Sequence, residues 1–217
     1  MLLAAAPAWA APFAVHLGDT RLVLDAPSGY ADTTFLGSPR LQELAESLTS
    51  ASNRVLLFAL SDNDLRRFTL GDPPDFRRYL VVVTPKALER ERMSTPAFQR
   101  MVEVALRGFQ PLPEKTEIAK LLDAQPVGLP LILAELRKEP TLVSTLQGTR
   151  LPPTKIPGVF GGSEKQNYML STSTLMHVRG RAINLAVFSV FETADDAAWV
   201  RTITLRWAED LQKLNGR

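Results

Sequence analysis

The sequence predicts an α+β fold: an antiparallel β-sheet flanked by helices, arranged as an α/β/α sandwich with a Pro-rich helical insert. Three observations indicate it. Apolar residues alternate on both sides of Gly18-Asp19, which is a hairpin pattern near the start of the chain. A longer pair of β-rich segments meets at residues 179–181, directly before the final helix. Strict alternation of strands and helices is absent, which disfavours a parallel, doubly wound sheet.

The elements of the first half follow from local patterns. After the hairpin at 13–24, Ser38 and Pro39 suit the first turn of a helix with an apolar stripe at Leu41, Leu44 and Leu48. Segments 54–61 and 76–84 have the composition of buried strands, and the stretch between them has turn residues at both ends and room for a short strand. A second helix begins at Thr95-Pro96 and ends near Gly108. Its expected buried face consists of Phe98, Met101, Val102, Ala105 and Phe109.

Residues 108–157 hold eight of the sixteen prolines. Proline fixes φ and removes a backbone donor, so long regular elements are not expected in this stretch. The sequence therefore predicts an irregular insert with short helices at 114–124 and 131–139. Neither piece could bury a core alone, so we expect the insert to pack on a single domain that spans residues 11–217.

Two adjacent acids, Asp195 and Asp196, stand where the last strand passes into the C-terminal helix. They could form a catalytic or metal-binding pair. Thr193 and Asp196 also have the spacing of a capping box, and acids in a first helical turn are favoured by about 0.3–1 kcal/mol each. The helical reading is preferred because it explains every residue, including the stripe Trp199, Ile203, Trp207, Leu211 and Leu214.

Composition narrows the compartment and the classes of function. The net charge of the 217 residues is only +2, which does not indicate nucleic-acid binding. The absence of cysteine excludes disulfides and thiolate chemistry, and two histidines are too few for a His-rich metal site. The start, MLLAAAPAWAAPF, is typical of the end of a signal peptide with a cleavage site after Ala10. We therefore expect residues 1–10 to be a signal-peptide remnant, the protein to be exported to the periplasm, and no transmembrane span to be present.

The remaining polar clusters do not assemble into a site. Asp62, Asp64, Asp72 and Asp75 resemble the start of a calcium loop, but Arg66, Arg67 and Pro73 occupy positions that should hold calcium ligands or glycine. The pairs Arg66-Arg67 and Arg77-Arg78, expected in or near strands, could bind an anion, although nearby acids favour ion pairs.

The Gly-rich stretch before Lys165 and Tyr168 lacks P-loop spacing, and it is expected to be a connector or the wall of a groove. His16 and His177 stand apart from any nucleophile pattern, so we expect surface or half-buried polar roles for them. No catalytic, cofactor-binding or metal-binding residue is therefore assigned, and no cofactor is expected.

The two ends of the chain resemble the PsbP-like superfamily. The resemblance rests on HLGDTRLVLDAPSGY and on GRAINLAVFSVFETADDAAWVRTITLRWAEDL, together about 80 residues of pattern without a signature motif. It implies a single-domain sandwich that acts through protein partners, and the Pro-rich stretch departs from it.

The sequence thus predicts an exported, non-enzymatic protein that binds a protein or membrane-associated partner in the cell envelope. The alternative is a periplasmic hydrolase or small-ligand-binding protein with a groove between the sheet and residues 108–165. Oligomeric state, ligand and pathway do not follow from the sequence.

Overall fold

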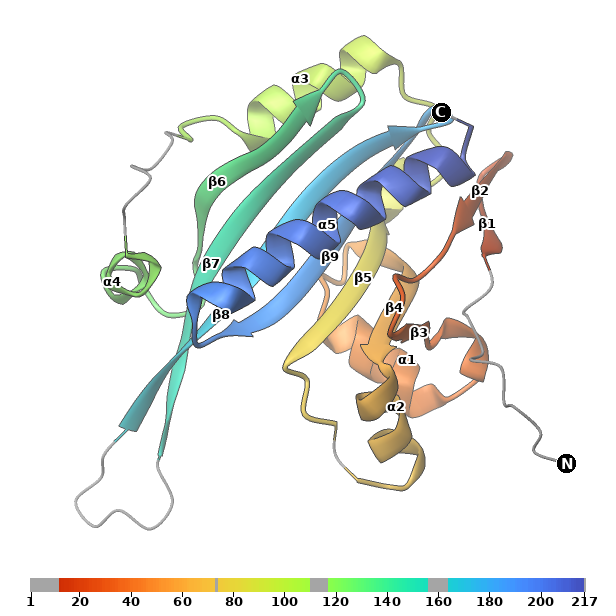
Figure 1. Cartoon of the computed structure of the whole chain (residues 1–217). Coiled ribbons are helices and arrows are strands. Elements are labelled where there is room, and N and C mark those ends of the chain that lie inside the picture. Colours follow the sequence, from red (N-terminus) through yellow and green to blue (C-terminus); the bar gives the residue numbers. More distant parts are fainter. Residues whose placement is uncertain (1–11, 73, 110–116, 156–163, 217) are drawn as a thin grey trace, which may run out of the picture.

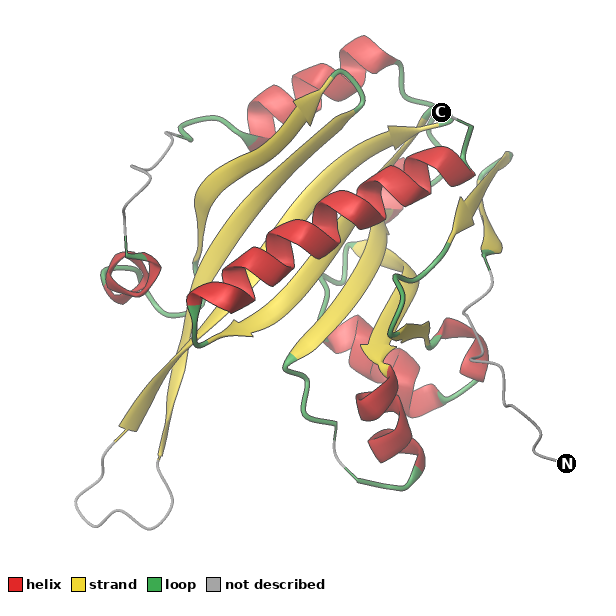
Figure 2. Ribbon diagram, viewed as in Figure 1, coloured by secondary structure: helices red, strands yellow, loops and turns green. Residues whose placement is uncertain are grey.

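A computed structural model of the chain shows a long, twisted antiparallel sheet with helices on both faces, which confirms the predicted fold class (Figure 1; Figure 2). It describes residues 12–72, 74–109, 117–155 and 164–216. The predicted signal-peptide remnant lies outside these residues. No helix in the described ranges is long and apolar enough to cross a membrane.

The first half of the chain supplies the N-terminal hairpin, one end of the sheet and three α-helices. Its elements are β1 (Phe13–Leu17), β2 (Thr20–Leu24), β3 (Tyr30–Asp32), the 3-10 turn η1 (Thr34–Leu36), α1 (Pro39–Ser47), β4 (Asn53–Ser61), α2 (Asp62–Thr69), β5 (Arg78–Pro85), η2 (Lys86–Leu88) and α3 (Thr95–Ala105). The hairpin turns at Gly18-Asp19, as predicted, and forms a small sheet of its own.

The second half supplies the rest of the sheet and the longest helix. Its elements are α4 (Ile118–Asp123), β6 (Pro130–Glu139), β7 (Leu142–Lys155), β8 (Glu164–Val178), β9 (Arg181–Phe191) and α5 (Ala194–Leu214). The seven-stranded sheet has the order β3-β4-β5-β9-β8-β7-β6, and every neighbouring pair is antiparallel. Because β5 pairs with β9, the two halves of the chain share one continuous sheet.

The predicted helical insert is wrong for residues 130–155, which form two strands of the sheet. The prediction of a helix at 131–139 rested on strong helix formers, but this segment pairs with β7 across a two-residue turn at Pro140-Thr141. The prolines are tolerated because Pro130 begins the edge strand, while Pro152 and Pro153 lie where β7 extends beyond β6. Only α4, within the predicted helix at 114–124, is helical in the described part of this region.

The stretch between β4 and β5 is a helix rather than a short strand. Ser61 caps α2, because its Oγ accepts the backbone N–H of Asp64 at 3.1 Å. Asp62 and Asp64 also place acids in the first turn, where the helix dipole favours them. Arg66 and Arg67 therefore lie on a helix rather than on the short strand for which the sequence left room.

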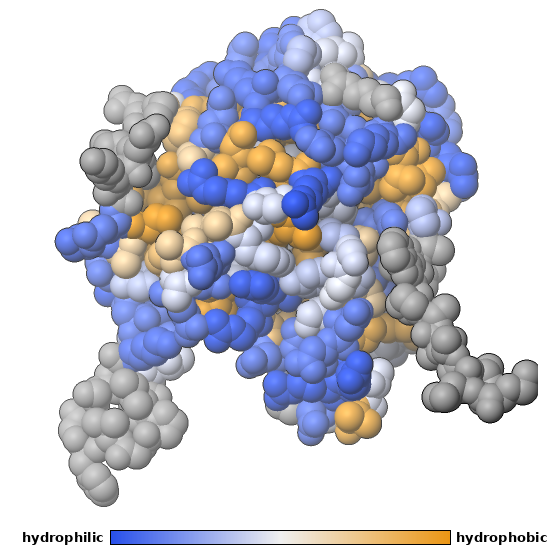
Figure 3. Space-filling view, viewed as in Figure 1, coloured by the Kyte–Doolittle hydropathy of each residue, from blue (hydrophilic) through white to orange (hydrophobic). Residues whose placement is uncertain are grey.

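Alternate residues of the central strands point to opposite faces of the sheet, and apolar clusters form on both faces. On one face, α5 and the β1–β2 hairpin cover a large cluster that includes Leu57, Leu80 and Val187. On the other face, α1 packs on a cluster with Phe58 and Val81, and α3 packs on a third cluster at the other end. On the α5 face, apolar surface remains visible alongside α5 between polar and charged patches (Figure 3).

The β1–β2 hairpin is fixed to the rest of the molecule by buried side chains that the sequence did not reveal. Asn215, at the end of α5, accepts the N–H of Val23 at 2.9 Å and donates to its carbonyl at 2.8 Å, as a neighbouring strand would. Arg181 is 2% exposed, and it donates to Thr20 Oγ1 at 3.0 Å and to Asp19 Oδ1 at 2.6 Å. The hairpin is therefore an integral part of the core.

Asp19 makes the stability of the protein depend on pH in the acid range. Hydrogen bonds from Arg92 and then Arg181 lower the pKa of Asp19 from 3.8 to about 2. Because the pKa is lower in the folded state, the carboxylate stabilises the fold above its unfolded pKa, and this contribution is lost as pH falls through about 2. Asp19→Asn should therefore be less stable than the wild type at pH 5, with the difference shrinking toward pH 2. Urea unfolding at several pH values measures this, and a difference independent of pH would contradict it.

Candidate functional site

The acid pair at the start of α5 has a structural role. Asp196 is buried, and its Oδ2 accepts the backbone N–H groups of Glu192 and Thr193, both at 3.0 Å. Burial raises its pKa, but these backbone bonds and Arg78, at 3.0 Å from Oδ1, outweigh burial and lower it. The predicted capping box is confirmed, and Asp195 is exposed beside it.

Arg77, Arg78 and Lys165 also lie in ion pairs that hold elements together. Arg77 pairs with Glu192 at 2.5 Å, and Glu192 also pairs with Lys165 at 3.0 Å. Arg78 pairs with Asp196 and lies 4.1 Å from the centre of the Trp199 ring. These contacts confirm the ion-pair interpretation for Arg77 and Arg78.

The aspartates of the failed calcium pattern and the two histidines are dispersed. Asp64 is buried and accepts the N–H of Asp75 at 2.7 Å, which fixes the loop after α2, while Asp62 and Asp72 are exposed. His16 is exposed, whereas half-buried His177 bonds through Nε2 with the carbonyl of Met93 at 2.7 Å. Within the described ranges, no group of three or more His, Cys, Asp or Glu side chains could hold a metal ion.

Tyr168 forms the last pair of β8 with β9, and Lys165 lies farther along, where the β7–β8 pair extends beyond its neighbours. The Tyr168 hydroxyl donates to Asp123 Oδ1 at 2.6 Å, and this bond raises the pKa of the tyrosine. The described part of the β7–β8 pair therefore contacts α4 through this hydrogen bond. The rest of the Gly-rich stretch, which was expected to form a connector or groove wall, lies outside the described residues.

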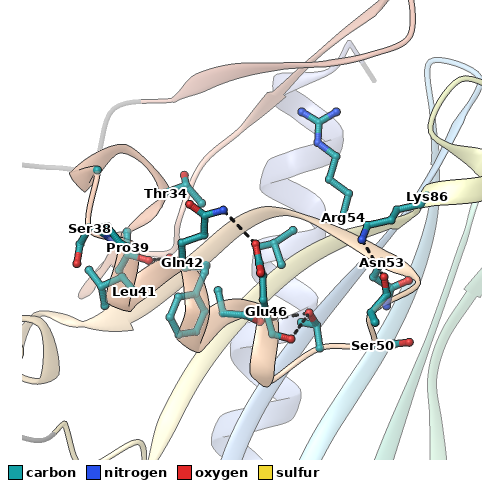
Figure 4. Close-up of a pocket in the computed structure, with 17 residues that line it drawn as sticks. Thr34, Ser38, Pro39, Leu41, Gln42, Glu46, Ser50, Asn53, Arg54 and Lys86 are labelled. Atoms are coloured by element: carbon teal, nitrogen blue, oxygen red, sulfur yellow. Dashed lines mark hydrogen bonds between the residues drawn. The ribbon is translucent and has the colours of Figure 1, made fainter.

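A cavity with a volume of about 610 Å³ lies between α1 and the outer edge of β4 (Figure 4). This volume is within the range typical of ligand sites. The lining residues come from η1, α1, β4, the start of η2 and the neighbouring loops: Thr33, Thr34, Gly37, Ser38, Pro39, Leu41, Gln42, Ala45, Glu46, Thr49, Ser50, Ala51, Asn53, Arg54, Val55, Phe58 and Lys86.

This cavity exists because β3 is short. β3 pairs only with residues 59–61 of β4, and the chain then leaves the sheet at Thr33. The N–H and Oγ1 of Thr33 both donate to the carbonyl of Phe58 at 2.8 Å, which closes the pairing. Gly37, with φ of +59°, then turns the chain into α1. Among the described residues, no strand pairs with the outer edge of β4 at 53–57.

The cavity combines an apolar floor with polar groups at its rim. Leu41 and Phe58 are buried in the core beneath α1. Gln42 donates to Glu46 Oε1 at 3.0 Å along α1, and Lys86 donates to the carbonyl of Ala51 at 2.8 Å (Figure 4). Such a lining can hold a ligand through apolar contacts and hydrogen bonds. Sequence reasoning missed it, because the lining residues come from segments that meet only in the folded chain.

A smaller cavity of about 350 Å³ lies between α3 and the β6–β7 turn. Its lining includes Phe98, Gln99 and Val102 from α3 and Lys138, Pro140 and Val143 from the strands. Residues 138–140, which were predicted to belong to a helical insert, therefore line this cavity as the end of β6 and the turn to β7.

The chain matches no protein-family model, and comparison with curated proteins and with solved structures gave no match.

Proposed function

We propose that the protein is an exported, non-enzymatic protein of the cell envelope that binds a protein partner at the α1–β4 cavity. The observation that carries this proposal is the position of the cavity along an unpaired sheet edge. Edge strands present rows of backbone donors and acceptors that readily pair with another chain. The signal-peptide pattern at residues 1–10 and the resemblance to the PsbP-like superfamily support the same proposal.

The alternative is a small-ligand-binding protein or hydrolase that uses the smaller cavity. The observation in its favour is that Lys138, Glu139, Pro140 and Val143 line this cavity. All four lie within the predicted groove region at 108–165. The α1–β4 cavity is preferred because it is the larger of the two and borders the unpaired part of β4.

Site-specific photo-crosslinking tests whether a partner protein contacts the α1–β4 cavity. A benzophenone amino acid is placed at Gln42 on α1, at Gln99 on α3 or at Arg206 on α5, all of which are exposed. Gln42 and Gln99 are matched glutamines, each lining one cavity, and Arg206 lines neither. After export and irradiation in cells, we expect a protein adduct from position 42 in the periplasmic fraction. An adduct from position 99 alone would contradict partner binding at the α1–β4 cavity, and recovery of the protein in the cytoplasm would contradict export.

A further inference from the structure

The outer edge of β4 has the length and accessibility for one added strand. Residues 53–57 lie beyond the last pairing with β3, and at about 3.4 Å per residue they offer roughly 17 Å of backbone. A bulge at Leu56 shifts the register with β5 between Val55 and Leu57. The bulge turns both Leu56 and Leu57 into the core, so it adds a bend to this edge, while Asn53, Arg54 and Val55 line the cavity.

The cavity floor fixes what the side chains of such a strand should be. Val55 and Phe58 belong to the face of β4 that packs against α1, and both line the cavity. Every second side chain of an added strand would point to this same face, because successive side chains alternate. These side chains would meet Leu41 and Ala45 on α1. The cavity therefore fits a strand with small or medium apolar residues at alternate positions.

Lys86, at one end of the cavity, indicates where an acidic residue of the added strand would lie. Lys86 lies beside the start of β4, because Asn53 pairs with Pro85 and the N–H of Lys86 donates to Ser52. Its ammonium has three donors, and one of them is used by the carbonyl of Ala51. A strand that continues the antiparallel direction of β3 would end near Lys86. Its acidic residue should then lie toward its carboxyl end.

Resting on the proposed function, we infer that the partner inserts an extended segment as an antiparallel strand on β4, apolar at alternate positions and acidic toward its C-terminal end. This mode of recognition is β-strand addition, in which main-chain bonds supply affinity and alternate side-chain pockets supply specificity. The sequence feature recognised is thus a short β-forming segment that ends in an acid.

The test uses fluorescein-labelled, amidated six-residue peptides and fluorescence anisotropy with the full exported chain. In the first peptide, threonine and valine alternate and glutamate is last; in the second, the order is reversed so that glutamate is first. Two further peptides carry N-methyl groups on one or the other alternate set of residues. We expect saturable binding of the first peptide, at least fivefold weaker binding of the reversed one, and loss of binding for only one N-methylated set.

Protein variants supply the matched control. Lys86→Glu should weaken binding of the first peptide at least fivefold, whereas Lys213→Glu on α5, far from the cavity lining, should not. Equal binding of both N-methylated peptides, or no binding of any peptide, would overturn strand addition. An adduct at position 42 in cells alongside such a result would leave partner binding standing and remove only this mode of recognition.

Discussion

Trp207→Ala should lower the free energy of unfolding by about 3–5 kcal/mol, the range found for large aromatic residues truncated in cores. Trp207 is 2% exposed and lies between α5 and the sheet in the largest core. Its indole N–H also donates to the carbonyl of Asp25 at 2.7 Å, in the segment that leads out of the hairpin. The substitution therefore removes packing and leaves a half-buried carbonyl without its donor. Urea unfolding followed by circular dichroism measures the change.

Trp199→Ala is the control on the same helix. The sequence placed Trp199 first in the apolar stripe of α5, but its side chain is only half-buried and packs on Arg78 and Tyr30. We expect a loss of only about 1–2 kcal/mol, from a cation–π contact and partial burial. Equal losses in the free energy of unfolding from the two substitutions would contradict the conclusion that Trp207 packs α5 on the sheet more than Trp199 does.

Gly18→Ala should lower the free energy of unfolding by about 2–5 kcal/mol, more than a positive φ explains alone. Gly18 has φ of +55°, and an added Cβ would lie 2.8 Å from Nη2 of Arg181. A left-handed conformation costs a non-glycine residue about 1–2 kcal/mol. Overpacking against a rigid neighbour adds about 1–3 kcal/mol. Arg181 has little room to yield because it is fully buried and bonded to the hairpin.

Gly37→Ala isolates the conformational part of this cost. Gly37 has φ of +59°, nearly the same as Gly18, but nothing lies within 4 Å of its added Cβ. The excess loss of Gly18→Ala over Gly37→Ala then measures the contact with Arg181. Equal losses in urea unfolding would show that Arg181 does not hold the hairpin rigidly.

Segments with a clear period could be predicted from the sequence. The hairpin at 13–24, α1, α3, the β8–β9 pair and α5 all lie where alternation or a helical stripe indicated them. The capping box at Thr193 was also readable, because its residues are neighbours in the chain.

The errors arise where distant contacts or a missed cap decide the structure. Residues 131–139 favour a helix locally, but the ladder with β7 overrides that preference. In α2, Ser61 followed by Asp64 was a capping signal that the turn-like composition obscured.

The candidate site was not predictable for a related reason. It forms where β3 stops short, and its walls come from α1, β4 and the start of η2, which meet only in the folded chain. Clusters of charged residues attracted attention in the sequence, yet Arg77, Arg78, Asp64 and Asp196 hold elements together. The side chains of the cavity are ordinary serine, threonine, glutamine and lysine, which carry no chemical signature on their own.

Crosslinking yield from position 42, compared with positions 99 and 206, tests partner binding at the α1–β4 cavity most directly. The account predicts a protein adduct from position 42 that exceeds those from the other two positions. It also predicts that the peptide ending in glutamate competes with formation of this adduct. Equal yields from all three positions, or an adduct confined to position 99, would contradict the proposal.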